Sequence, residues 1–388
     1  MISHALVNIL KNYVDKNKNY DLEPLDFTKL FLLSKRQGVA GIVYDAIGEK
    51  VDNKELKNKW QLSYFATMQK GMIFEKEFTE IIKKINENNI KVVTYKGSII
   101  KHLYPNPYLR LMGDIDFGFD IKDADIIVKF MEELDYQVEK DYFNHRNFSK
   151  KPYVNIEFHG SLHEDELELD DRYYDNFLTE AVHFNDDVLT LNPTMHFMYL
   201  ITHLYQHMVN GGIGIRSYLD LYLFMNQNHH EINYEVVENE FKKMGLHKFY
   251  DVTIKFINKA FKGQDDLSNE LYEEYLEYIF SGGIYGEIDK AKIDERMMIA
   301  KNKSKFSYVM RRLFPKYSAL KEKYPVLKKP LMFLLAPAFY MFRIFSLLFK
   351  GKKLKKSIEF ISTSENEKIR KFSEEIGLIT KGKEDRND

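Results

Sequence analysis

The stretch that decides the fold is VVTYKGSIIKHLYPNPYLRLMGDIDFGF, residues 92–119. Its first four residues, 92–95, are β-branched or aromatic, which predicts a short buried strand. Residues 96–98 (Lys-Gly-Ser) predict a turn, and residues 99–104 predict the first turns of a helix. After a loop marked by two prolines, a second strand is predicted around residues 114–116 (Asp-Ile-Asp).

The second strand carries two acidic side chains that are predicted to point to the same side. Because side chains alternate across a strand, Asp114 and Asp116 share one face, while Ile115 and Phe117 share the other. Two carboxylates on one face repel each other unless a cation lies between them. A Gly-Ser turn that opens a helix offers backbone N–H groups and a positive dipole end to a phosphate. Together these features predict half of a site for a nucleoside triphosphate (NTP) with magnesium.

This order of motifs resembles the nucleotidyltransferase superfamily, which includes enzymes like DNA polymerase β. The superfamily signature is Gly-Ser or Gly-Gly, a short spacer, and then Asp-x-Asp or Asp-x-Glu. Here Gly97-Ser98 is followed by fifteen residues before Asp114, at the long end of the usual spacing. A fuller string of motifs more narrowly resembles a bacterial group of uncharacterised nucleotidyltransferases: in order along the chain, KG, then YP-P, then R--GDID. The resemblance extends over residues 6–345, and its specific motifs lie in residues 92–160.

The resemblance implies a two-metal site made of three carboxylates. Glu157 lies on a predicted alternating strand, 153–159. The superfamily places its third carboxylate on this strand, after the two that correspond to Asp114 and Asp116. The sequence Glu157-Phe158-His159 also resembles the family's acidic–x–His pattern. Three carboxylates suffice for two Mg²⁺ (or Mn²⁺) ions, one accompanying the triphosphate and one lowering the pKa of the attacking hydroxyl. Glu157 is alternatively a general base. The competing interpretation is a pair of exposed edge-strand acids with an unrelated glutamate.

Four residues near this stretch are candidates for contacts with the phosphates. The backbone N–H groups of Gly97 and Ser98 are expected to hold the β- and γ-phosphates, with the Ser98 hydroxyl as an additional donor; an ordinary strand-to-helix turn is the alternative. Lys96 and Arg110 are expected to neutralise phosphate charge. Arg110 alternatively pairs with Asp114 to orient it, and a solvated surface charge is the default for either cation.

A predicted helical region further along the chain contributes three more candidates. A Gly-Gly turn followed by Arg216 and Asp220 resembles the family's helical-domain signature. Arg216 is expected to reach the triphosphate or to buttress the cleft. His203 and His207 lie four residues apart on a predicted helix and so face the same side. A zinc site is one interpretation, but no third ligand is evident nearby, so packing in the core or at a domain interface is favoured.

Composition limits the class of protein. The 388 residues are enough for two or three packed units, and 44% hydrophobic with 30% charged residues is typical of soluble globular proteins. The absence of cysteine excludes a disulfide framework or a cysteine-based metal site and fits a cytoplasmic location. The first residues predict an amphipathic helix and not a signal peptide.

The expected fold class is α/β: a minimal nucleotidyltransferase core with a short mixed β-sheet, embedded between helical regions. The expected organisation, in order, is a helical N-terminal region at 1–88, the core at 89–164, an acidic linker at 165–191, a helical domain at 192–300, and a basic and apolar helical region at 301–388.

Apolar periodicity predicts which helix faces are buried. The helix predicted at 54–88 has an apolar stripe that includes Phe65 and Met72. The helix predicted at 124–134 is expected to be capped by Asp123 and to turn Ile126, Ile127, Phe130 and Met131 inward.

The C-terminal region raises a separate question. Residues 301–360 contain sixteen Lys or Arg and two Glu, a net charge of +14. Residues 331–349 are mostly apolar and flanked by lysines. For segment 328–356 the favoured interpretation is therefore a buried pair of helices. A peripheral contact with an anionic membrane ranks second, and a membrane span ranks last. A contact with RNA is an electrostatic alternative.

The function predicted from the sequence is transfer of a nucleoside monophosphate from an NTP, with ATP as the expected donor, to an unidentified hydroxyl or phosphate acceptor. Acceptors in the superfamily include sugars, small molecules, RNA and proteins, and fold analogy does not choose among them. One alternative is a toxin-like nucleotidyltransferase that modifies RNA or tRNA and uses the basic C-terminal region. Another is a catalytically silent nucleotide-binding scaffold, which is disfavoured because such a protein has no physical reason to keep three crowded carboxylates.

Overall fold

The computed structural model describes residues 2–281 except 21, 23, 24, 143, 163–171 and 211, and also describes residues 340 and 371–378. The chain divides into two units, Met1–Glu287 and Ile288–Asp388. Nearly all of the described residues belong to the first unit, which has an α/β fold with a seven-stranded sheet, as predicted.

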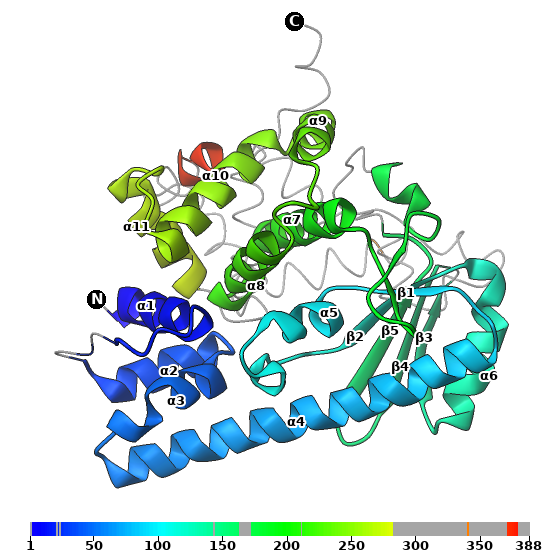
Figure 1. Ribbon diagram of the computed structural model, residues 1–388, viewed down its shortest axis with the longest axis horizontal. Coiled ribbons are helices and arrows are strands. Elements are labelled where there is room, and N and C mark those ends of the chain that lie inside the picture. Colours follow the sequence, from blue (N-terminus) through cyan, green and yellow to red (C-terminus); the bar gives the residue numbers. More distant parts are fainter. Residues whose placement is uncertain are drawn as a thin grey trace, which may run out of the picture. The chain divides into compact units, whose positions relative to one another are not determined.

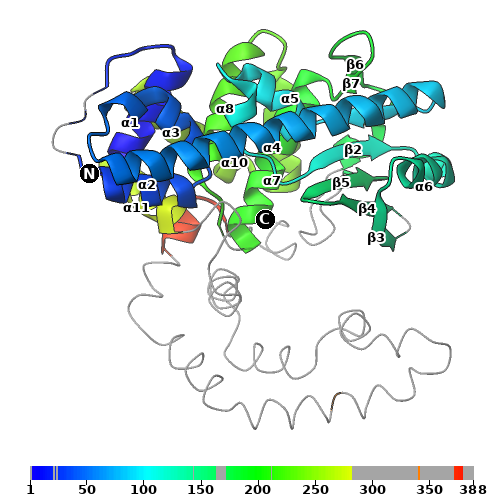
Figure 2. The same cartoon turned by 90° about the horizontal axis from the view of Figure 1, so that it is seen from below.

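The first unit begins with three short helices and one long one. These are α1 (Ile2–Val14), α2 (Phe27–Arg36), α3 (Ala40–Ile47) and α4 (Lys54–Glu87). With 34 residues, α4 is about 51 Å long at 1.5 Å per residue. Its N-terminal half packs on α3, where Trp60 Nε1 donates a 2.8 Å hydrogen bond to Ala40 O, and its C-terminal half reaches the sheet (Figure 2). The helix therefore joins the N-terminal helices to the core.

A glycine in the middle of α4 permits a close backbone approach. A Cβ atom on Gly71 would lie 2.7 Å from Tyr108 O and 2.9 Å from Tyr108 Cα. Glycine normally weakens a helix interior, so the contact with the loop before the acidic strand explains its presence. Through this contact α4 supports the segment that leads into the site.

The sheet is mixed, with strand order β3-β4-β5-β2-β1-β7-β6. Two pairs, β2 with β5 and β1 with β7, are parallel, and the other neighbours are antiparallel. Helices α5 and α6 connect strands of the core. The bounds are β1 (Val92–Thr94), α5 (Gly97–Ile100), β2 (Ile115–Phe119), α6 (Ala124–Glu133), β3 (Gln137–Tyr142), β4 (His145–Lys150), β5 (Val154–His159), β6 (Val182–His183) and β7 (Leu189–Thr190).

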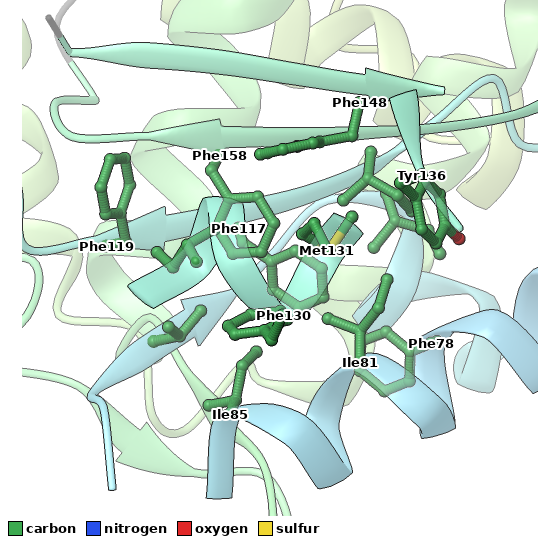
Figure 3. Close-up of a cluster of buried hydrophobic side chains, with 14 of the residues drawn as sticks. Phe78, Ile81, Ile85, Phe117, Phe119, Phe130, Met131, Tyr136, Phe148 and Phe158 are labelled. Atoms are coloured by element: carbon green, nitrogen blue, oxygen red, sulfur yellow. The ribbon is translucent and has the colours of Figure 1, made fainter. Parts of the chain in front are cut away.

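One face of the sheet forms an apolar core with α4 and α6 (Figure 3). Phe117 of β2 lies between two aromatic rings, with centroids 4.9 Å from Phe158 of β5 and 5.9 Å from Phe78 of α4. Phe130 and Met131 of α6 are buried in the same cluster. Because strand side chains alternate, burial of Phe117 and Phe158 on this face turns their neighbours in sequence to the opposite face.

Within the described residues up to 281, helices α7 to α11 follow the sheet, and α7 lies on the face opposite α4 (Figure 1). Tyr95, directly after β1, packs edge-on against Tyr199 of α7 with centroids 5.1 Å apart. The helices are α7 (Pro193–Asn210), α8 (Ile215–Gln227), α9 (Tyr234–Met244), α10 (His247–Ile257), which continues into a π-helical turn (Asn258–Lys262), and α11 (Asn269–Ser281).

Three sequence predictions about helices α4 and α6 are wrong. Phe65 and Met72 of α4 are each 56% exposed, because the buried face of this long helix changes partners along its length. Ile126 of α6 is 39% exposed, while its neighbour Ile127 is fully buried. Asp123 occupies the N-cap position of α6, but its side chain makes no capping hydrogen bond.

Two pairs of strands lie where the sequence predicted a loop through Asn144 and Asn147, leading to the strand at 153–159, and an acidic linker at 165–191. β3 and β4 form an antiparallel hairpin between α6 and β5, and β6 pairs with β7 within the expected acidic linker. The basic and apolar segment 328–356 and the first part of that linker, 165–171, lie outside the described residues apart from residue 340. None of the described helices combines the length and the apolar character that crossing a bilayer requires.

Candidate active site

The acidic residues gather on the sheet face that points away from the apolar core. In the parallel register of β2 and β5, Asp116 is paired with Glu157. β2 begins at Ile115, one residue later than the strand start expected from the sequence, so Asp114 directly precedes the strand. All three line the same cavity.

Asp116 is the most enclosed of the three carboxylates, with 3% of its surface exposed. Its Oδ1 accepts a 2.8 Å hydrogen bond from Lys96 Nζ, and His159 Nε2 lies 3.3 Å from the same oxygen. Burial alone raises the pKa of a carboxyl group, but here the positive charge of Lys96 and the contact with His159 outweigh it. The pKa of Asp116 is therefore held well below its ordinary value, and this side chain stays ionised.

Asp114 has the opposite electrostatic balance. Burial, followed by repulsion from Asp116, raises the pKa of Asp114 from 3.8 to about 6, although Lys96 opposes the shift. Two neighbouring carboxylates with pKa values driven apart are characteristic of a site that concentrates negative charge.

Glu157 is surrounded by nitrogen donors. Asn147 Nδ2 donates a 3.2 Å hydrogen bond to Glu157 Oε1, while the Nε2 atoms of His145 and His159 each lie 3.4 Å from Oε2. Interactions with these two histidines hold the pKa of Glu157 well below its ordinary value, despite partial burial. A weakly basic carboxylate is better suited to binding a cation than to accepting a proton.

The carboxylates face a cavity of about 300 Å³ between the sheet and helices α7 and α8. This volume is at the lower end of the range for small-molecule sites, about 300–1,000 Å³. Of the eight residues that the sequence predicts to bind metal or nucleotide, the cavity brings together seven: Lys96, Gly97, Arg110, Asp114, Asp116, Glu157 and Arg216.

Ser98 is the predicted site residue whose side chain does not line the cavity. It is 2% exposed, and its hydroxyl has no hydrogen-bond partner among the described residues. Its backbone N–H and that of Gly97 are the first of α5, where no partner is available within the helix. The structure therefore gives the Ser98 hydroxyl no place in the cavity, and the two amides at this turn have no partner within the helix.

Arg110 is held in a buried ion pair with Asp220 of α8. Its Nε and Nη2 donate hydrogen bonds of 2.9 and 2.7 Å to the two carboxylate oxygens, and Tyr104 Oη donates a third bond of 2.7 Å. Arg110 therefore pairs with Asp220 and not with Asp114, the alternative partner expected from the sequence. A Cβ on Gly97 would lie 2.6 Å from Arg110 Nη1. Glycine is required here because the guanidinium packs directly against the turn.

Arg216 and two histidines complete the helical wall. The Nη1 of Arg216 donates a hydrogen bond to Leu111 O, which ties α8 to the loop before Asp114. His203 and His207 of α7 face the same side, as expected, and their Nε2 atoms are hydrogen-bonded at 3.0 Å. Burial lowers the pKa of His203 well below its ordinary value and that of His207 to about 4. They line the cavity as neutral imidazoles, a role that their sequence spacing did not reveal.

Some important residues were missed because their partners are remote in sequence. Asp220 stood beside Arg216 in the helical-domain signature, but only the fold shows that it binds Arg110, which is 110 residues away. His145 lies on β4, in a segment expected to be a loop. The register of β4 against β5, in which His145 opposes His159, supplies the missing information.

A short mixed sheet that presents three carboxylates beside a Gly-Ser turn defines an α/β nucleotidyltransferase fold. The chain belongs to the family described as uncharacterised nucleotidyltransferase, whose family model matches residues 23–262. No curated protein and no solved structure matched the chain in the corresponding comparisons.

Proposed function

We propose that the protein transfers a nucleoside monophosphate from an NTP, with ATP as the expected donor, to a hydroxyl or phosphate group of an acceptor. The observation that carries the proposal is the shared cavity: Asp114, Asp116 and Glu157 face it together with the cations Lys96 and Arg216. Carboxylates alone would repel a triphosphate, and cations alone would bind one without activating it. Both charges in one cavity suit a metal–nucleotide complex.

The donor set fits Mg²⁺ or Mn²⁺. Asp114, Asp116 and Glu157 offer only carboxylate oxygens, the ligands that these ions prefer. The raised pKa of Asp114 reflects burial and repulsion that a cation would relieve. When bound, a divalent ion supplies charge neutralisation of the triphosphate and acidification of an attacking hydroxyl.

The residues of the chain have separate roles in this proposal. Lys96 and Arg216 attract the triphosphate, and the amides of Gly97 and Ser98 donate to its oxygens. Arg110 donates from two of its nitrogens to Asp220, so its role in this proposal is to support the Gly97 turn and not to move toward a phosphate. Glu157, with its low pKa, acts as a ligand and not as the general base.

Calorimetric titration of a non-hydrolysable ATP analogue tests this function. Wild-type protein should bind the analogue only with Mg²⁺ or Mn²⁺ present, and the double variant Asp114→Ala/Asp116→Ala should lose binding. His230→Ala is a matched surface control, because His230 is exposed and lies outside the cavity. If the wild type binds none of the four nucleotides with either metal, the proposal is wrong. Binding justifies an acceptor screen with labelled NTPs.

A further inference from the structure

A second group of metal-ligating side chains lies on the same sheet face as the carboxylates. Antiparallel pairing of β4 and β5 places His145 opposite His159. Glu157 precedes His159 by two residues in β5, so both point to the same face. One ligand atom from each of the three residues lies within 4.8 Å of the others.

Both imidazoles turn the same nitrogen toward one carboxylate oxygen. Nε2 of His145 and Nε2 of His159 each lie 3.4 Å from Glu157 Oε2. The two rings are stacked, with centroids 4.5 Å apart and planes inclined by 18°. Both Nε2 atoms are buried, and neither makes a hydrogen bond within the part of the chain that the structure describes. Two buried nitrogens thus converge on an oxygen without bonding to it.

The spacing of these atoms fits ligands around a metal ion better than hydrogen-bond partners. The 3.4 Å separations exceed the usual N–H···O distance of about 2.7–3.2 Å. Ligands about 2.0–2.1 Å from a tetrahedral ion lie about 3.3–3.4 Å from each other. The two nitrogen–oxygen separations therefore match those of ligands that share one ion, and all three ligand atoms lie within 4.8 Å of one another.

The surroundings hold the ligands in place and leave the group accessible. The hydrogen bond from Asn147 to Glu157 Oε1 fixes the carboxylate, so that Oε2 faces the imidazoles; such outer partners orient metal ligands. The side chains of His145, Glu157 and His159 remain 33%, 26% and 18% exposed. An ion can therefore enter from solvent.

We propose that His145, Glu157 and His159 form a binding site for a divalent transition metal ion of the zinc type. Imidazole nitrogen suits Zn²⁺ and its first-row neighbours, whereas Mg²⁺ prefers oxygen. Three protein ligands leave coordination positions open for water or a substrate oxygen. Asp116 Oδ1, 3.3 Å from His159 Nε2, places the ion beside the carboxylates. Glu157 would be a ligand shared by this ion and by the Mg²⁺ of the nucleotide site. The inference thus deepens the proposed function and rests on it only for the roles of Asp114 and Asp116.

Cobalt substitution tests the site directly. The full-length chain, stripped with a chelator, should bind one equivalent of Co²⁺ with visible d–d absorption, and Zn²⁺ but not excess Mg²⁺ should displace it. His145→Ala and Glu157→Gln should each weaken Co²⁺ binding at least about tenfold. Glu157→Gln keeps the acceptor for Asn147, so it guards against a folding defect in His145→Ala, which circular dichroism also checks. Asp114→Asn and the surface variant His230→Ala should leave the spectrum unchanged.

The outcomes separate this inference from the proposed function. The inference is wrong if the wild type binds neither Co²⁺ nor Zn²⁺ more tightly than Mg²⁺. It is also wrong if His145→Ala and Glu157→Gln bind Co²⁺ as the wild type does. In either case the three residues form a metal-free polar network. Mg²⁺-dependent nucleotide binding in that case leaves the proposed function standing. A Co²⁺ spectrum lost in both ligand variants supports the site even if no nucleotide binds.

Discussion

Replacing Asp220 by asparagine should destabilise the protein more than a typical surface substitution. Asp220 and Arg110 form a bidentate ion pair at 2.7 and 2.9 Å, and each side chain is only 6% exposed. The substitution keeps the shape but removes the negative charge, so the guanidinium remains buried without a counter-ion. Removing one partner of a buried pair costs about 3–5 kcal/mol, so the free energy of unfolding should fall by at least about 3 kcal/mol.

Two further variants distinguish a charge effect from a general loss of packing. Tyr104→Phe removes a single hydrogen bond to the Asp220 carboxylate and should cost about 1.5–3 kcal/mol. The double variant Arg110→Met/Asp220→Leu removes both charges and should be less destabilised than Asp220→Asn, because apolar replacement of a buried pair is often nearly neutral. The NTP affinity of the double variant should still fall, since Arg110 packs against Gly97 at the cavity.

Urea unfolding, followed by the fluorescence of the single tryptophan and by circular dichroism, measures these differences. The double-mutant cycle with Arg110→Met and Asp220→Leu gives the coupling energy of the pair. A loss below about 1 kcal/mol in Asp220→Asn, or a double variant as unstable as the sum of the single ones, would refute the reasoning. Either result would mean that water reaches the pair.

Three further predictions concern the acidic pair, the turn and the core. Burial and a neighbouring carboxylate raise the pKa of Asp114 to about 6, so between about pH 4 and 6 the folded state binds a proton that the unfolded state lacks. In chelator, Asp114→Asn should therefore exceed the wild type in thermal stability at pH 8 and lose most of that advantage as the pH falls from about 6 to about 4. A pH-independent difference would contradict this. Gly97→Ala should lower NTP affinity in calorimetry and lower the free energy of unfolding in urea by about 1–3 kcal/mol. The reason is that the new Cβ would lie 2.6 Å from Arg110 Nη1. An unchanged affinity and an unchanged free energy of unfolding would show that the turn accommodates a methyl group. Phe158→Ala, at a buried position, should lower the free energy of unfolding by about 3–5 kcal/mol in the same urea assay. Phe65→Ala, at an exposed position, should lower it by less than about 0.5 kcal/mol. Similar losses in the two variants would contradict the assigned burial.

The strands predicted correctly are those with a strong one-sided pattern. β5 alternates Ile156 and Phe158, both fully buried, with Glu157 and His159 on the other face. The hairpin of β3 and β4 was missed because its sequences, QVEKDY and HRNFSK, are polar on both faces. In β4 only Phe148 is buried. Pairing with a neighbouring strand, not burial, holds such a strand in the sheet, and pairing leaves little trace in composition.

The candidate site was predictable where its residues are close in sequence. Gly97, Asp114 and Asp116 form a local motif within twenty residues. Lys96, which donates to Asp116, belongs to the same local stretch. Other partners come from elsewhere: His159 lies 43 residues beyond Asp116, and Asp220 reaches Arg110 from α8. Sequence spacing predicts candidate ligands of such a site, but contacts between residues that are remote in sequence emerge only from the fold.

Lys96 illustrates how the fold creates a constraint that the sequence does not express. Its backbone has φ 52° and ψ −128°, a conformation that ordinarily belongs to glycine and that costs about 1–3 kcal/mol for other residues. A hydrogen bond of 3.0 Å from its N–H to Nε2 of His196, 100 residues away, holds it there. Burial lowers the pKa of His196 to about 3, so the imidazole stays neutral and able to accept that bond. Glycine would relieve the strain, but it would also remove the ammonium group that donates to Asp116 at 2.8 Å. A strained lysine in place of an unstrained glycine therefore supports the proposal that the cation beside the Gly97 turn contributes to binding the triphosphate.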